Sequence, residues 1–195
     1  MENGQRINKA IERGVFWGLI YLILIIPSMI VSFVAQWYPQ GFVIKILSLV
    51  VSLGSLIAGI LLYVGIWALG KKRRDQVLTK HLKVWFVLGA TFLVWILLTS
   101  SNTILSSSIK LPLTFALIPL VISMGVFLIL LGKDFKRLES DFGKPATRAA
   151  SWNKISGWLM VIVLLSPIGA LLSVIADYYM WRVLQEEVKR HGTKK

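Results

Sequence analysis

Five long intervals without a charged residue divide this chain. They cover residues 14–44, 46–70, 84–109, 111–132 and 155–176. Each interval is long enough to cross the hydrocarbon core of a bilayer as a helix, which takes about 20 mostly apolar residues. Because lipid offers no partner for backbone N–H and C=O groups, such an interval has to form a helix. The sequence therefore predicts an all-α fold, a polytopic transmembrane bundle of five apolar helices.

The residues between the intervals set the expected boundaries. WYPQG, at residues 37–41, is a tight uncharged turn, and Gly143 with Pro145 ends a short helical stripe after the fourth interval. We expect one integral membrane domain over residues 1–195, with long loops at residues 70–83 and 133–154. The expected spans are residues 14–38, 42–69, 84–100, 111–132 and 155–177.

Basic residues predict the orientation of the bundle. The chain has 22 Lys and Arg against nine Asp and Glu, a formal net charge of +13. Three basic residues precede the first span and six lie in each long loop, whereas Lys45 and Lys110 stand alone between the other spans. Cytoplasmic loops carry an excess of Lys and Arg, so we predict a cytoplasmic N-terminus.

The last apolar interval allows two topologies. LLSPIGALLSVIADYYMW, at residues 164–181, contains Pro167 and Gly169 within an apolar run. A single crossing kinked at Pro167 puts the basic tail outside, whereas a re-entrant wedge turning at residues 166–169 returns it to the cytoplasm. Length favours the crossing, which we prefer, and the charge of the tail favours the wedge. Both place Asp177 at the membrane surface as an interfacial anchor beside aromatic residues.

Small residues form a stripe on the second span. The stripe repeats at steps of four, three and four residues, so its members share one helix face. Small residues allow the close backbone approach that holds helices together in lipid. We prefer a contact with another span of this chain over a seam for a partner subunit or a second copy. The stripe consists of Ser48, Ser52, Ser55 and Gly59.

Spans one and five carry similar polar faces, each spaced at i, i+4 and i+8. If the two helices run parallel, these faces form a small polar niche at their outer ends. Ordinary interfacial polar residues are the alternative, and we prefer it. The niche would consist of Ser28, Ser32, Gln36, Gly169, Ser173 and Asp177.

Few residues of this sequence suggest chemistry. It has no cysteine, and its two histidines, His81 and His191, lie in hydrophilic segments, where they cannot hold a haem inside the bundle. Ser107 and Lys110 have the S-x-x-K spacing of Ser–Lys acylases, but a solvated serine-rich loop is the preferred interpretation. We expect no catalytic residue, cofactor or metal, and no nucleic-acid partner.

The last third of the chain resembles a group of known proteins. FKRLESDFG, at residues 135–143, is followed by WNKISGWLMVIVLLSPIGALLSVIA, at residues 152–176. This order resembles small prokaryotic, mostly archaeal, multi-pass membrane proteins of unknown function. The resemblance implies a prokaryotic plasma membrane and no activity.

Charge confined to the span ends predicts the function class. We expect a non-enzymatic accessory or scaffold subunit that packs against other membrane proteins, or itself, and against anionic lipid. A transporter or channel component with an uncharged polar path is the alternative, and a membrane enzyme ranks third. Anionic headgroups attract basic residues at the span ends. The residues expected to contact them are Lys71, Lys72, Arg73, Arg74, Lys136 and Arg137.

Overall fold

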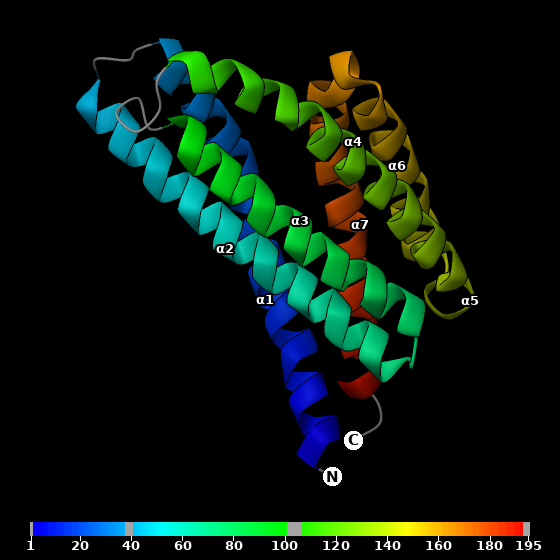
Figure 1. Ribbon diagram of the computed structural model, residues 1–195. Helices are drawn as coiled ribbons and strands as arrows, with labels where there is room; N and C mark the ends of the chain where they lie inside the picture. Colours follow the sequence, from blue (N-terminus) through cyan, green and yellow to red (C-terminus); the bar gives the residue numbers. More distant parts are fainter. Residues whose placement is uncertain (1, 38–40, 101–106, 193–195) are drawn as a thin grey trace. The chain divides into compact units, whose positions relative to one another are not determined.

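The computed structural model is all-helical over the residues that it describes, which confirms the predicted fold class (Figure 1). It describes the backbone of residues 2–37, 41–100 and 107–192, and the side chains of residues 4–31, 34, 41–44, 46–91 and 117–190. The elements are α1 (Glu2–Trp37), α2 (Phe42–Lys72), α3 (Gln76–Ser100), α4 (Ser107–Arg137), α5 (Glu139–Phe142), α6 (Lys144–Val161), the 3₁₀ turn η1 (Val163–Leu165) and α7 (Ser166–Gly192).

Four helical segments among the described residues are long and apolar enough to cross a membrane. They are Gly4–Val31, Phe42–Lys72, Leu117–Arg137 and Val163–Arg190. The predicted count of five spans is not confirmed. The predicted third span, residues 84–100, lies in α3, and its side chains from residue 92 onward lie outside the described residues.

The predicted fifth span, residues 155–177, is not one helix. α6 ends at Val161, Ile162 adopts φ −82° and ψ 91°, and α7 begins at Ser166. A Cβ added to Gly169 would lie 2.8 Å from the backbone oxygen of Ser156. In a continuous helix these two residues would be about 20 Å apart. The chain therefore reverses direction at residues 162–165.

The preferred kinked crossing at Pro167 is therefore wrong. Pro167 is the second residue of α7, where a proline leaves no intrahelical hydrogen bond unmade, because the first N–H groups of a helix have no partner in it. The break comes before the proline, in the apolar sequence Ile162–Leu165.

Packing divides the chain into two compact units. Unit 1 contains residues 1–75 and 177–195, and unit 2 contains residues 76–176. Helix α7 begins in unit 2 and continues into unit 1. The prediction of one membrane domain over residues 1–195 stays a prediction.

Unit 1 is built on the close approach of α1 and α2. A Cβ added to Gly14 would lie 2.6 Å from the Cα of Gly65, so backbone meets backbone at this point. One turn along α1, a Cβ on Gly18 would lie 2.8 Å from Leu62. Such contacts need glycine, because any side chain would force the helices apart. The fully buried apolar side chains of this unit include Ile11, Leu62, Ile66, Leu69, Met180, Val183 and Leu184.

In unit 2, glycines allow a similarly close approach of the backbones of α4 and α6. A Cβ on Gly125 would lie 2.7 Å from the backbone oxygen of Gly157, and one on Gly132 would lie 2.7 Å from that of Ala150. These pairs show that α4 and α6 run antiparallel. The face of α6 buried in this way consists of Ala146, Ala149, Ala150, Asn153, Ser156, Gly157 and Met160.

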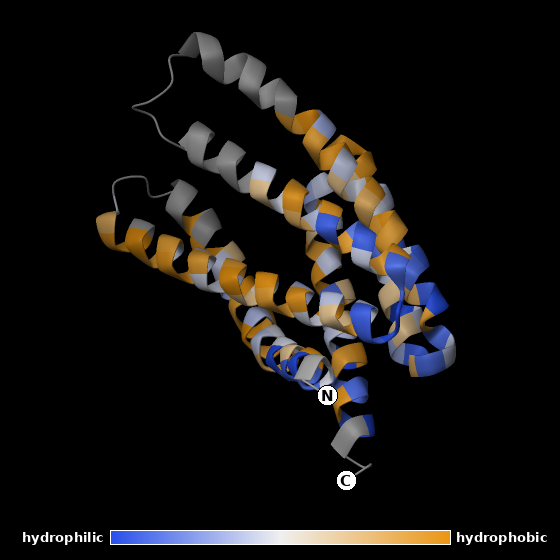
Figure 2. Ribbon diagram, turned by 60° about the horizontal axis from the view of Figure 1, so that its bottom comes forward, coloured by the Kyte–Doolittle hydropathy of each residue, from blue (hydrophilic) through white to orange (hydrophobic). Residues whose placement is uncertain are grey.

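Short α5 makes the turn between α4 and α6. Gly143 adopts φ +60°, a conformation that favours glycine, and ends α5. The Glu139 carboxylate accepts hydrogen bonds from Lys136 and from the Thr147 hydroxyl, and these hold its pKa below the usual value. Figure 2 shows hydrophilic residues around α5 and the adjoining ends of α4 and α6. Charge is therefore concentrated at one end of unit 2.

Candidate functional site

Asp177 is a buried carboxylate held by two tyrosines in unit 1. Its side chain is 3% exposed. The Tyr21 hydroxyl of α1 donates to Oδ2 at 2.8 Å, and the Tyr63 hydroxyl of α2 donates to Oδ1 at 2.9 Å. Burying a carboxylate is costly unless hydrogen bonds replace those made by water. We call Asp177, Tyr21 and Tyr63 the tyrosine–carboxylate site; it joins all three helices of the unit.

Asp177 is buried among helices of this chain, and its predicted place at the membrane surface stays a prediction. Tyr21, Tyr63 and Asp177 each lie inside a segment long and apolar enough to cross a membrane. An ionisable residue at such a position is a functional hypothesis by default. The clue in the sequence was the position of the two tyrosines, well inside apolar runs, because a buried tyrosine hydroxyl needs a partner.

Trp181 links α7 to α1 one turn after Asp177. Its Nε1–H donates to the backbone oxygen of Val15 at 2.8 Å. The indole also lies against Gly18, where an added Cβ would be 2.7 Å from the ring. The absence of a side chain at Gly18 therefore leaves room for both Trp181 of α7 and Leu62 of α2.

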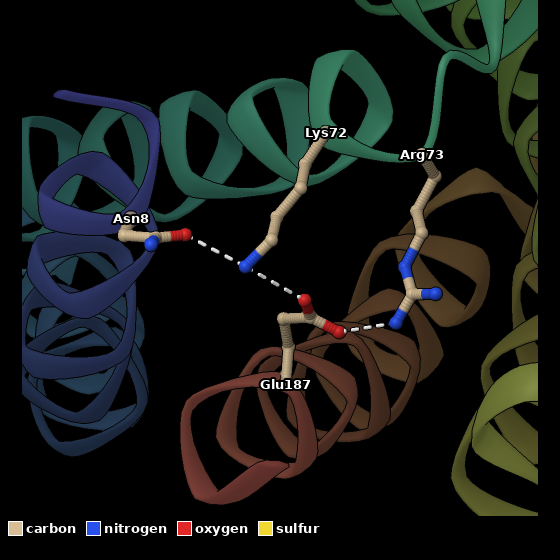
Figure 3. A network of polar contacts seen from close by, with 4 residues as sticks. All are labelled: Asn8, Lys72, Arg73 and Glu187. Atoms are coloured by element: carbon tan, nitrogen blue, oxygen red, sulfur yellow. Dashed lines mark hydrogen bonds and ion pairs between the residues drawn. The ribbon is translucent and has the colours of Figure 1, made fainter. Parts of the chain in front are cut away.

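A second polar cluster lies at the charged end of unit 1 (Figure 3). Glu187 of α7 is 2% exposed, and its two oxygens accept from Lys72 Nζ at 2.9 Å and Arg73 Nη2 at 2.5 Å. Lys72 also donates to Asn8 Oδ1 of α1 at 2.6 Å. We call Asn8, Lys72, Arg73 and Glu187 the charged clamp. It ties the start of α1, the end of α2 and the end of α7 together.

These contacts fix the direction of α7 within unit 1. Asp177 meets Tyr21, Trp181 meets Val15, and Leu184 lies against Gly14. Residue numbers rise along α7 as they fall along α1, so the two helices are antiparallel. The parallel packing on which the predicted polar niche depended is wrong.

The other members of that niche make local contacts where they are described. The Ser28 hydroxyl donates to the Ile25 oxygen, and the Ser173 hydroxyl donates to the Ala170 oxygen. Gly169 packs on α6 in unit 2. The side chains of Ser32 and Gln36 lie outside the described residues.

The predicted small-residue stripe on α2 faces α1 at one end. A Cβ on Gly59 would lie 3.1 Å from the Tyr21 ring, and Ser55 is buried. Gly59 therefore contacts a helix of the same chain, in line with the preferred interpretation. Ser48 and Ser52 are half-buried, and a role for them in a seam stays a prediction.

Most of the basic residues predicted to contact lipid have protein partners. Lys72 and Arg73 bind Glu187, and Lys71 lies 3.6 Å from the centre of the Trp67 ring. Arg74 is exposed, with φ +55°. Headgroup binding stays a prediction for these residues.

Lys136 and Arg137, the two basic residues predicted to contact lipid in unit 2, also have protein partners. Lys136 pairs with Glu139 at 2.5 Å, and Arg137 pairs with Asp134 at 2.9 Å. Both basic side chains remain exposed, so headgroup binding stays a prediction here too.

His81 has a structural partner in unit 2. Its Nδ1 lies 2.6 Å from Oδ2 of the fully buried Asp134, which joins α3 to α4. Arg137 pairs with the other oxygen of Asp134. The side chains of Ser107, Lys110 and His191 lie outside the described residues. Within the described part of the chain, no group of three or more His, Cys, Asp or Glu side chains could hold a metal ion.

Removing the charge of Glu187 is expected to loosen the charged clamp. In Glu187→Gln, Lys72 and Arg73 lose their carboxylate, and we expect the free energy of unfolding to fall by about 1.5–3 kcal/mol, the usual contribution of hydrogen bonds to charged groups. Thermal unfolding in detergent measures the loss. Glu186→Gln is the matched control, because Glu186 is more exposed and lies 3.8 Å from Lys189. Equal losses in the two variants would contradict a special role for Glu187.

Comparisons with known proteins identify no relative of this chain. No protein-family model, no curated protein and no solved structure matches it.

Proposed function

We propose that this chain is a non-enzymatic integral membrane subunit or scaffold that packs against another membrane helix. One observation carries the proposal, an apolar stripe on the outer face of α1. Its members repeat at steps of three, four, three and four residues and are 45–61% exposed. A repeat of this kind places large side chains along one line of a helix, as in paired helices. The stripe consists of Phe16, Leu19, Ile23, Ile26 and Ile30.

The buried acids support the same proposal. Asp177 and Glu187 join α7 to α1 and α2, and Asp134 joins α4 to α3. Each acid therefore holds helices of this chain together. In unit 1, the contacts of Asp177 and Glu187 join the three helices and leave the α1 stripe on the surface, which suits a scaffold.

Site-directed cross-linking tests the partner. Because the chain has no cysteine, a benzophenone can be attached to a single Cys at Ile23 on the stripe. Illumination of native membranes is expected to link Ile23→Cys to another membrane protein or to a second copy. The control is Ile57→Cys, at a similarly exposed apolar position on α2 (52% against 61%). Adducts with lipid alone at both positions would contradict a partner on the α1 stripe.

A transporter or channel component is the second candidate, and the tyrosine–carboxylate site favours it. Carboxylates buried among membrane helices mark ion and proton pathways in many transporters. Liposomes that contain only the pure protein and a pH-sensitive dye would report proton flux. Flux that is abolished in Asp177→Asn and kept in Glu186→Gln would overturn the scaffold proposal in favour of this one.

A further inference from the structure

The segment from α6 through η1 into α7 forms a helical hairpin in unit 2. Gly169 of α7 lies against Ser156 and Met160 of α6, so the two arms are antiparallel. The hairpin turns at residues 162–165. No charged residue occurs between Ile155 and Ala176, so the turn and the adjoining parts of both arms are apolar.

The tip of the hairpin exposes large apolar side chains. Leu164 is 91% exposed, and its apolar neighbours at the turn and on both arms are 44–60% exposed. An apolar patch of this kind normally marks an interaction surface. The exposed side chains lie on both arms as well as at the turn. Lipid acyl chains can surround such a patch from all of these directions, so they suit it as a partner. The neighbours are Ile155, Trp158, Ile162, Ile168 and Leu171.

The register with α4 gives the depth of the tip. Gly132 is level with Ala150, and Gly125 is level with Gly157 and Val161. The tip follows Val161 directly, so it is level with α4 residues 121–124. Charge begins on α4 at Lys133. About ten residues separate that charge from the level of the tip, or roughly 15 Å, half of a hydrocarbon core of about 30 Å.

Charge at the base of the hairpin fixes the side of entry. α6 starts beside the charged end of α4, where Lys133, Lys136 and Lys144 lie around α5. In unit 1, the end of α7 lies in the charged clamp together with the start of α1 and the end of α2. The contacts of unit 1 thus place the end of α7 beside the start of α1.

We propose that α6, η1 and the first half of α7 are a re-entrant hairpin whose tip inserts among the acyl chains of one leaflet, the leaflet next to the basic loops. Its apolar tip takes lipid as its partner, and its arms enter and leave on one side. The inference rests on α4 crossing the membrane and is independent of any protein partner on α1.

Single cysteines in sealed proteoliposomes of phosphatidylcholine and phosphatidylglycerol test the hairpin. Leu164→Cys and Ile162→Cys probe the tip, Lys194→Cys probes the tail, and Ser140→Cys in exposed α5 is the control for the basic side. An impermeant maleimide is expected to label Ser140→Cys and Lys194→Cys from the same side. It should leave both tip cysteines unlabelled from either side.

A depth measurement completes the test. A fluorophore attached in detergent at Leu164→Cys should be quenched at least twofold more by a nitroxide at the middle of the acyl chain than by one at the headgroup. Labelling of the tip from the side opposite Ser140→Cys would show two full crossings and overturn the proposal. Labelling of the tip from the Ser140→Cys side would overturn it too, as would labelling of Lys194→Cys from the opposite side. Cross-linking at Ile23 reports separately on the scaffold proposal, so the two can fail independently.

Discussion

The double variant Tyr21→Phe with Tyr63→Phe is expected to lose about 3–5 kcal/mol of stability, because it leaves a buried carboxylate without its hydrogen bonds. Asp177 is 3% exposed, and the two hydroxyls bind one oxygen each. Phenylalanine keeps the rings, so packing changes little. Thermal unfolding of the purified protein, followed by the loss of helical circular dichroism, measures the effect.

Further variants separate this hydrogen bonding from general damage. Adding Asp177→Leu to the double variant is expected to recover most of the lost stability. The three side chains at this site would then all be apolar, and none would need a hydrogen-bond donor. Tyr178→Phe is the matched control, at an exposed tyrosine next to Asp177, and should stay within about 0.5 kcal/mol of the original protein. If the triple variant were less stable than the double variant, the tyrosine–carboxylate site would have another basis.

Replacing Gly14 by leucine is expected to separate α1 from α2. Its Cβ alone would lie 2.6 Å from the Gly65 Cα, a backbone atom that cannot rotate away. Overpacking of a well-packed core typically lowers stability by about 1–3 kcal/mol. Leucine adds four carbons at Gly14, so we expect a loss of about 3 kcal/mol or more. Moving α1 away from α2 would also weaken the hydrogen bonds to Asp177. Proteolysis and thermal unfolding would report both effects.

Gly89→Ala in α3 is the control for this substitution. No atom lies within 4 Å of a Cβ added there, and alanine favours a helix over glycine by about 0.5–1 kcal/mol. We therefore expect Gly89→Ala to keep or raise stability. A Gly14→Leu protein that unfolds at the same temperature as the original would rule out close packing at Gly14.

Hydropathy predicted the helices well because lipid permits few other structures. The long apolar runs became helices, and Gly59 meets a helix of the same chain. Hydropathy did not predict the structure of the last apolar run, residues 155–176. There, Pro167 suggests a kink in a single crossing, whereas the chain reverses direction. The reversal comes at Ile162–Leu165, residues with no turn preference, and depends on the packing of Gly169 against α6. Contacts of that kind are not encoded in a local pattern.

The protein partners of the charged residues could not be predicted, for a related reason. The end of a charge-free run predicts the edge of the membrane but not the burial of Asp177 within the protein. Two tyrosines from distant parts of the chain make its burial tolerable. Local charge predicts lipid contact for Lys72 and Arg73 but not their pairing with Glu187, more than 100 residues away. A GxxxG spacing at Gly14 and Gly18, present in the sequence, would have indicated the α1–α2 contact.

The composition of unit 1 has a consequence for the order of biosynthesis. Domains fold as the chain is made, from the N-terminal side, so α1 and α2 are made before the rest of unit 1. Their partner, the second half of α7, is made only after all of unit 2. Until then, Tyr21 and Tyr63 cannot bind Asp177, and Arg73 cannot bind Glu187. The α1–α2 pair is therefore completed by a segment made more than 100 residues later, and a chain cut short before residue 177 would retain an unfinished α1–α2 pair.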